Sequence, residues 1–164
     1  MEGALRPGHF AGVATVVSKL LLMAMPDRAY FGEKDYQQLQ VIKRMVRDLS
    51  MPFEIVGMPT VREPDGLAMS SRNRYLSAGD RERALGLSRG LRAAEAAWNT
   101  GEHSAERLAA ITRDHVAACM DRIDYVAAVD PDTLLPPTGA TERLVVLIAA
   151  HLGTTRLIDN LELC

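Results

Sequence analysis

Apolar residues fill most positions from 12 to 25, so a helix over these residues is apolar around most of its circumference. This pattern is typical of a helix that is covered on more than one side, and Pro26 ends it. Residues 28–31 predict a short strand. Residues 35–49 place apolar side chains at helical spacing between charged ones, which predicts an amphipathic helix, and residues 53–58 predict a second strand.

The order helix, strand, helix, strand with short links predicts a parallel α/β sheet. In such sheets ligands bind beyond the carboxyl ends of the strands, so residues 32–35 and 59–72 are the segments in which to look for chemistry. Two strands are marginal as a sheet on their own. We therefore expect residues 1–75 to be part of a domain whose apolar surface is covered by a second polypeptide or by self-association.

Residues 76–164 have a different pattern and predict a small α+β domain. The spacing of Ser77 and Asp80 predicts a capping box at the start of a helix that extends to Thr100. A second helix is expected over residues 104–122. Three strands are expected at residues 125–129, 144–150 and 155–159, with a loop at residues 136–139.

The composition is that of a globular protein, with 48% hydrophobic and 24% charged residues among 164. A net charge of −2 and an aromatic content of 5% argue against a nucleic-acid-binding surface. Ser18 and Lys19 interrupt the longest apolar run, which falls short of the about 18 residues that span a membrane. No signal-peptide pattern is seen, and the two cysteines, Cys119 and Cys164, make no disulfide framework. We expect a cytoplasmic protein with no nucleic-acid or membrane partner.

The first segment of interest joins the end of a strand to the start of a helix at residues 31–38. Gly32 permits close approach of the backbone to a ligand, and Lys34 supplies a point charge suited to phosphate. Asp35 can cap the helix, whose free amides attract anions. A solvated turn with an ordinary helix cap fits the same spacing, and the spacing alone favours that interpretation.

The second segment lies at residues 65–73 and follows the turn at Gly66. It places Ser70, Ser71 and Arg72 in a row, and these side chains offer the donors that grip a polyphosphate. A polar loop that caps a helix is an equally good interpretation of this segment in isolation.

Four motifs in order make a more specific pattern: RPGHFAGV at residues 6–13, FGEKDYQQ at 31–38, DGLAMSSRNRYL at 65–76 and LGTTRLIDN at 152–160. They resemble the motifs of the pantoate–β-alanine ligase (pantothenate synthetase) family over essentially the whole chain. The resemblance implies an α/β fold, in which the second half of a Rossmann-like nucleotidyltransferase domain with parallel strands precedes a small α+β C-terminal domain.

Members of this family adenylate the carboxylate of pantoate with ATP and release pyrophosphate, after which the amine of β-alanine displaces AMP. Such chemistry gathers negative charge, which cations and fixed dipoles must neutralise. The resemblance implies that Lys34, Ser70, Ser71 and Arg72 grip the ATP phosphates, the last three as the counterpart of the family's KMSKS-like loop. No spacing of Cys or His suggests a structural metal, so Mg²⁺ is expected to arrive with ATP.

The remaining positions implied by the resemblance surround the nucleoside and pantoate. Gly32 and Asp35 are expected to face the ribose, Val61 and Met69 the adenine, and Gln38 an oxygen of pantoate. Arg6 and His9 are expected on a flexible stretch that closes over the phosphates. For His9, a loop histidine bonded to nearby backbone is an equally good interpretation.

The family's chain begins earlier, with a strand, an HxGH pair of histidines and a glutamine that holds pantoate. His9, His103, His115 and His151 show no such spacing, so the chain resembles the C-terminal portion of the enzyme. Loss of one such phosphate donor costs about 100-fold in rate. The alternatives are a ligase completed by a separate N-terminal half, an inactive fragment or paralogue that binds nucleotide or self-associates, and a ligase for another acid and amine. The family's homodimers imply a homodimer here as well.

Overall fold

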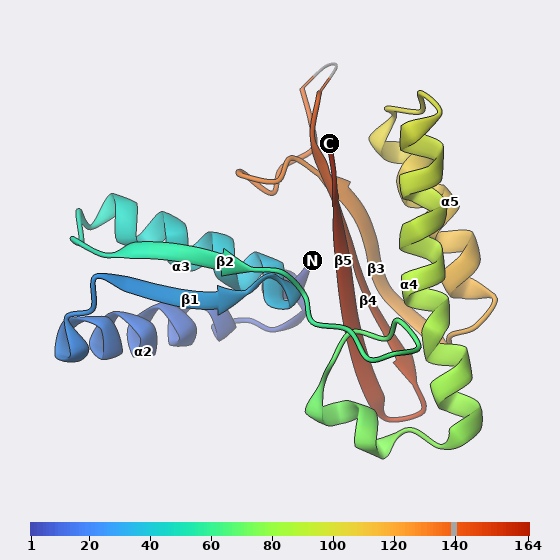
Figure 1. Cartoon of the computed structure of the whole chain (residues 1–164), viewed down its shortest axis with the longest axis horizontal. Helices are drawn as coiled ribbons and strands as arrows, with labels where there is room; N and C mark the ends of the chain where they lie inside the picture. Colours follow the sequence, from blue (N-terminus) through green and yellow to red (C-terminus); the bar gives the residue numbers. More distant parts are fainter. Residues whose placement is uncertain (139–140) are drawn as a thin grey trace. The chain divides into compact units, whose positions relative to one another are not determined.

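The computed structural model describes residues 1–138 and 141–164, which form two compact units, Met1–Thr60 and Val61–Cys164 (Figure 1). Residues 61–75 belong to the second unit by their contacts. The domain boundary expected after residue 75 stays a prediction, because a family domain and a unit of contacts need not coincide. Gly139, the last residue of the loop expected at 136–139, lies outside the described residues.

The first unit alternates helices and strands. Its elements are α1 (Glu2–Leu5), α2 (His9–Ala24), β1 (Arg28–Gly32), the 3₁₀ turn η1 (Glu33–Asp35), α3 (Tyr36–Asp48) and β2 (Glu54–Met58). β1 and β2 pair in parallel, with Arg28 opposite Glu54 and Gly32 opposite Met58. The parallel α/β arrangement predicted from the hydrophobic pattern is therefore confirmed.

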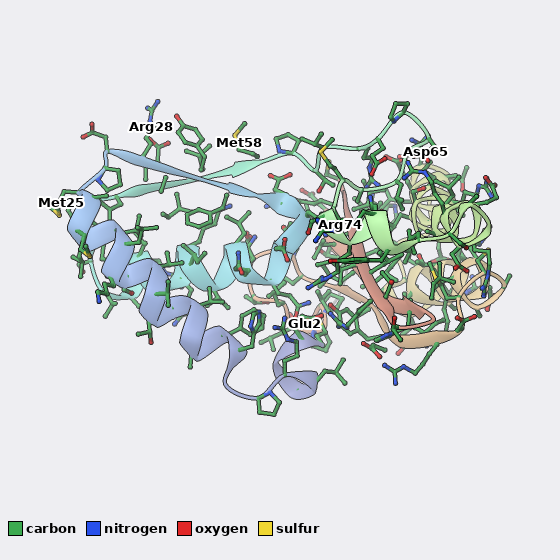
Figure 2. The ribbon with its side chains drawn as sticks, turned by 90° about the horizontal axis from the view of Figure 1, so that it is seen from below. Glu2, Met25, Arg28, Met58, Asp65 and Arg74 are labelled. Atoms are coloured by element: carbon green, nitrogen blue, oxygen red, sulfur yellow. The ribbon has the colours of Figure 1, made fainter. Side chains whose placement is uncertain are left out.

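Both long helices of the first unit lie on the same side of its sheet, as Figure 2 shows. A small core of Leu21, Val46 and Phe53 joins them, and Ala29 and Ile55 pack against it from the strands. Arg28 and Met58 point away from the helices, toward the other face of the sheet (Figure 2). Among the described residues no helix of this unit covers that second face.

The apolar helix α2 is largely uncovered. Leu21 is its one buried residue, whereas Val16, Leu20, Leu22 and Met23 are all more than half exposed. The sequence predicts a helix covered on more than one side, but the described residues cover α2 along the Leu21 side only.

The described part of the second unit contains a short 3₁₀ helix, two α-helices and an antiparallel sheet. Its elements are η2 (Ser71–Tyr75), α4 (Ala78–Asn99), α5 (Ala105–Ala117), β3 (Arg122–Val129), β4 (Leu144–Leu152) and β5 (Thr155–Leu163), with strand order β3-β4-β5. The two helices cover one face of the sheet (Figure 1). The Ser77 cap of the predicted capping box is present, since the Ser77 hydroxyl accepts from the amide of Asp80 at 3.1 Å, and the hydroxyl also donates to the Asp80 carboxylate at 2.7 Å.

Four boundaries in the second unit differ from those predicted. β3 begins at Arg122 rather than at residue 125, and β4 continues to Leu152 rather than 150. α5 ends at Ala117 rather than near residue 122, because Met120 turns into the core and Arg122 already pairs with His151 of β4. β5 continues to Leu163 rather than ending near residue 159, because β4 offers it a partner along its whole length. Within residues 1–138 and 141–164, none of the helices has the length and apolar character needed to cross a membrane.

Candidate nucleotide-binding segments

The segment after β1 has the geometry expected of a ligand-binding turn. Gly32 ends the strand, Glu33–Asp35 form a single 3₁₀ turn, and α3 begins at Tyr36. The free amides of the first turn of α3 therefore lie at the carboxyl end of β1, where they attract anions. The φ angle of Gly32 is −68°, which any residue adopts, and a Cβ there would meet no described atom within 4 Å. The backbone at this position is open to a ligand.

Asp35 stands at the N-cap position of α3, but its carboxylate makes no capping hydrogen bond. The interpretation of Asp35 as an ordinary helix cap is therefore wrong. Its φ and ψ angles of −92° and 58° depart from the extended conformation that a capping side chain usually requires. The Asp35 carboxylate is exposed, so it can accept a hydrogen bond from a ligand. The contact with a ribose remains a prediction.

Two neighbouring glutamines at the start of α3 have different surroundings. Gln37 is buried, and its amide oxygen accepts a hydrogen bond from the backbone of Glu2 at 3.2 Å. This bond ties α1 to α3. Gln38, the predicted pantoate ligand, follows Gln37 in α3 and is half-buried.

The structure brings Arg6 and His9 together at the start of α2. Arg6 Nη1 lies 3.3 Å from His9 Nε2, and the same guanidinium forms an ion pair with Glu2 at 3.8 Å. Gly8 precedes His9 with a φ of 78°, a left-handed conformation that favours glycine. Because α2 begins at His9, residues 9–13 of the expected flexible stretch are helical.

In the second unit, Val61 and Met69 meet across a closed loop. The amide of Met69 donates to the carbonyl of Val61 at 2.9 Å, and Arg62 and Ala68 form an antiparallel bridge just inside it. Val61 is 63% exposed and Met69 54% exposed. Two apolar residues predicted from the resemblance to face adenine are thus joined by a backbone hydrogen bond, and both are exposed.

The row of donors that follows the loop forms the start of η2. The hydroxyl of Ser70 accepts from the amide of Arg72 at 3.2 Å and so caps this short helix, which bears out the capping interpretation of the segment. Ser71 and Arg72 are exposed. A local cap and a set of outward donors therefore coexist in three residues.

Sequence reasoning missed the side chains that hold this loop. Asn73 donates to Glu63 at 2.6 Å, and Arg81 donates to Glu63 at 2.5 Å and to Asp65 at 2.9 Å. The hydrogen bond from Asn73, followed by that from Arg81, holds the pKa of Glu63 below its usual range. The amide of Leu67 and the guanidinium of Arg81 likewise lower the pKa of Asp65.

A second connection joins the loop to the sheet. Arg62 donates from two nitrogens to the carboxylate of Asp159 in β5, at 2.8 and 3.0 Å. The two residues are 97 positions apart, so no local spacing could have predicted the pair. The one signal was that the motif at 152–160 contains an acid inside an apolar strand.

Among the residues that the structure describes, no three His, Cys, Asp or Glu side chains gather in a way that could hold a metal ion. The family model described as pantoate-beta-alanine ligase matches residues 1–162. The chain belongs to this family.

Relatives in the pantoate-beta-alanine ligase family match nearly all of the chain. It is 55% identical over 99% of its length to the pantothenate synthetase of Rhodopirellula baltica and 58% identical over 98% to that of Myxococcus xanthus. The crystal structure of pantothenate synthetase from Thermus thermophilus is 51% identical, with a TM-score of 0.92 over 98% of this chain and 58% of that one. The chain spans 57% of the Rhodopirellula protein and 56% of the Myxococcus protein.

A more distant member of the pantoate-beta-alanine ligase family was solved with nucleotide and amine. The structure of the enzyme from Francisella tularensis, complexed with beta-gamma ATP and beta-alanine, is 34% identical with a TM-score of 0.69. Against this family, the predicted site residues of the chain divide between its two units. The first unit holds Arg6, His9, Gly32, Lys34, Asp35 and Gln38, and the second holds Val61, Met69, Ser70, Ser71 and Arg72.

Proposed function

We propose that the chain supplies the phosphate-gripping and adenine-facing part of a ligase that joins pantoate to β-alanine at the expense of ATP. The observation that carries the proposal is the closed loop that holds Val61 beside Met69 and leads directly into the exposed donors Ser71 and Arg72. An apolar pair followed by hydroxyl and guanidinium donors matches the two ends of a nucleotide, a flat base and a polyphosphate.

The proposed reaction has two displacements. An oxygen of the pantoate carboxylate attacks the α-phosphorus of ATP, the bond to the β-phosphate breaks, and pyrophosphate leaves with the electron pair. The amine of β-alanine then attacks the acyl carbon, its proton goes to solvent, and AMP leaves. Charge builds up on the phosphate oxygens in the first step, where fixed cations and donors lower the barrier.

Each candidate residue has one task in this scheme. Lys34 and Arg72 neutralise the phosphates, and the hydroxyls of Ser70 and Ser71 donate to them. Val61 and Met69 flank the adenine. The ribose lies against Gly32 and Asp35, Gln38 donates to pantoate, and Arg6 and His9 lie near the phosphates. Mg²⁺ travels with ATP, held by its phosphate oxygens.

The same proposal includes a partner for the first unit. Tyr30 and Met58 are exposed on the uncovered face of the β1–β2 sheet, and the apolar residues of α2 are exposed as well. Apolar patches of more than a few hundred Å² mark interfaces. The occupant is the N-terminal portion of the family fold, with the HxGH pair, and the complete site forms when that portion is present. We keep the expected cytoplasmic setting as part of this proposal.

Two other functions fit particular observations. The exposed apolar surface of the first unit favours self-association, so the chain can serve as a non-catalytic nucleotide-binding or self-association module, including a homodimer. Most of the acid and amine pocket belongs to the N-terminal half that the resemblance implies, so the residues of this chain fit a ligase for another acid or amine as well. Product analysis with alternative acids and amines separates this last function from pantothenate formation.

Activity tests the catalytic proposal. The purified chain should form no pantothenate from pantoate, β-alanine and Mg-ATP, and adding a purified N-terminal half from a relative should start the reaction. In that mixture Lys34→Ala should lower the rate at least about 100-fold, as removal of one charge-stabilising donor does. Lys43→Ala, which alters an exposed lysine on the outer part of α3, is the matched control.

The outcomes separate the proposed functions. Turnover by the chain alone rejects the need for the N-terminal half. No turnover in the mixture, with Mg-ATP still bound, favours the non-catalytic module. A near-normal rate for Lys34→Ala rejects the role given to that residue.

Sedimentation tests the proposed partner. At micromolar concentration the chain should occur as a dimer, or as a complex once the N-terminal half is added. A single compact species of 17.9 kDa that does not bind the added N-terminal half would reject the proposed interface.

A further inference from the structure

The stem of the Val61–Met69 loop is anchored on β5 by a bidentate ion pair. Arg62 Nη1 donates to Asp159 Oδ2 at 2.8 Å, and Nη2 donates to Asp159 Oδ1 at 3.0 Å. The Asp159 side chain is only 1% exposed, and its Oδ1 also accepts from the amide of Asn160 at 2.8 Å. Both carboxylate oxygens are therefore used, and the direction of the Arg62 guanidinium is fixed.

The same guanidinium also holds the tip of the loop. Arg62 Nη1 donates to the carbonyl of Gly66 at 3.1 Å. Gly66 has a φ of 92°, which places its carbonyl in an orientation that other residues rarely adopt. One side chain thus connects the sheet, the stem and the tip.

Asn73 holds the other end of the segment, just after the exposed donors. Its amide nitrogen donates to Glu63 at 2.6 Å and to the carbonyl of Ala68 at 3.1 Å. Asn73 is 7% exposed, and its Oδ1 is buried without a hydrogen-bond partner among the described residues. An orphaned buried acceptor costs free energy, and the two hydrogen bonds that the nitrogen donates offset that cost.

We propose that Arg62, Asp159 and Asn73 are positioning residues, which hold Val61–Arg72 in the shape that presents the adenine-facing pair and the phosphate donors together. This inference rests on the proposed function and deepens it, because none of the three residues is among those assigned to touch the nucleotide. The C-terminal sheet thereby becomes part of the nucleotide site through Asp159.

The chemistry of the pair indicates orientation rather than stability alone. Apolar residues of similar size stabilise a buried position as well as an ion pair does, because desolvation offsets the attraction between the charges. Unlike apolar side chains, a guanidinium offers several hydrogen-bond donors in a fixed plane. Here Arg62 donates to three different acceptor atoms, the carbonyl oxygen of Gly66 and the two carboxylate oxygens of Asp159, and so fixes their positions.

The test compares Arg62→Lys, which keeps the charge and loses the planar fork, with the parent chain. Arg83→Lys is the matched control, since Arg83 binds Asp121 at 2.5 Å and the carbonyl of Cys119 at 2.9 Å in the same unit, away from the loop. The first readout is the rate of trypsin cleavage after Arg72 and Arg74, both exposed. The second is calorimetric affinity for Mg-ATP, and the third is urea unfolding followed by Trp98 fluorescence.

Arg62→Lys should raise cleavage after Arg72 and Arg74 about tenfold and weaken Mg-ATP binding about tenfold, the effect of losing one charged hydrogen bond. Its urea midpoint should move no further than that of Arg83→Lys. Asp159→Asn, which keeps the volume and one acceptor, should behave in the same direction and serves if Arg62→Lys does not fold.

Equal cleavage rates in the parent and in both loop variants overturn the positioning inference, whatever the affinities. So does faster cleavage that Arg83→Lys reproduces, because the effect is then general loss of stability. Absence of Mg-ATP binding by the parent contradicts the proposed function instead, and cleavage then decides the positioning by itself.

Discussion

The two units of the chain bury their apolar residues to very different extents. In the second unit β4 is buried along nearly its whole length, and α4 and α5 cover one face of the sheet. In the first unit α2 is the more apolar helix by sequence, yet Leu21 is its one buried residue. α4, rich in arginine and alanine, buries nine residues.

This difference shows that the hydrophobic pattern of a helix does not by itself fix how much of that helix the described residues bury. The pattern of α2 suits a helix with neighbours on more than one side, and the described residues supply neighbours on one. Stability and interaction should therefore separate between the units. Apolar residues should stabilise the second unit and recruit a partner to the first.

The largest expected effect comes from the same substitution in a helix of each unit. Leu108→Ala in α5 removes a side chain that is 0% exposed and should lower the free energy of unfolding by about 2–5 kcal/mol. Leu20→Ala in α2 removes one that is 62% exposed and should change it by less than about 0.5 kcal/mol. Trp98 fluorescence follows the second unit in urea, and amide exchange of α2 follows the first. Both variants are compared at a concentration below that at which the proposed dimer forms, and a loss of about 2 kcal/mol or more for Leu20→Ala there would contradict the contrast between the two helices.

A smaller effect, opposite in sign between the units, is expected from glycine-to-alanine changes in helices. A Cβ at Gly86 of α4 would lie 2.7 Å from Cβ of Cys119, so Gly86→Ala should destabilise by about 1–3 kcal/mol. A Cβ at Gly12 of α2 would meet no described atom within 4 Å, so Gly12→Ala should stabilise by about 0.5–1 kcal/mol. Thermal unfolding measures the first and amide exchange the second. A change in stability of the same sign for Gly86→Ala and Gly12→Ala would contradict the contrast between a packed α4 and an open α2.

The smallest expected effect is the response of the second unit to acid. Hydrogen bonds from Asn73 and Arg81 hold the pKa of Glu63 low, and the amide of Gly153 followed by Arg83 does the same for Asp121. A carboxylate with a lowered folded pKa contributes stability above its unfolded pKa of about 4, and this is lost as the pH falls through the folded value. The urea midpoint reported by Trp98 should thus fall as the pH is lowered from about 5 to about 3.

Asp121→Asn should flatten that pH dependence, whereas Asp114→Asn, a change at an exposed position of α5, should leave it as in the parent. A midpoint that is independent of pH in the parent would contradict the role given to these hydrogen bonds. In the first unit the comparable case is Asp48, whose pKa is lowered first by the hydrogen bond from Arg44; both residues are exposed on α3. Such exposed pairs contribute little to stability, so acid should affect this unit less.

Features set by nearby residues were predicted well from the sequence. The Ser77–Asp80 cap, the parallel strands on either side of an amphipathic helix and the turn at Gly32 all depend on spacings of a few residues. Boundaries set by distant pairing were not. β5 continues past residue 159 because β4 pairs with it as far as Leu163. The polar residues Asn160 and Glu162 do not predict that pairing from the sequence.

The candidate site shows the same division. The short motifs located Lys34, Asp35 and the row from Ser70 to Arg72, because each lies within one turn. The meeting of Val61 with Met69 depends on a backbone hydrogen bond that only the folded loop reveals. The Arg62–Asp159 pair joins residues far apart in the chain, so the acid inside the apolar strand marked Asp159 as unusual but could not identify its partner.

The Arg62–Asp159 pair can form only after both residues have been synthesised. Asp159 leaves the ribosome 97 residues after Arg62, a delay of roughly 5–20 s at about 5–20 residues per second. During this interval the first unit can already form its parallel pair through α3, while the segment that follows it has no carboxylate to bind. By this argument the Val61–Met69 loop is among the last parts of the chain to take shape, and a nascent chain stalled before β5 would present Ser71 and Arg72 in no fixed arrangement.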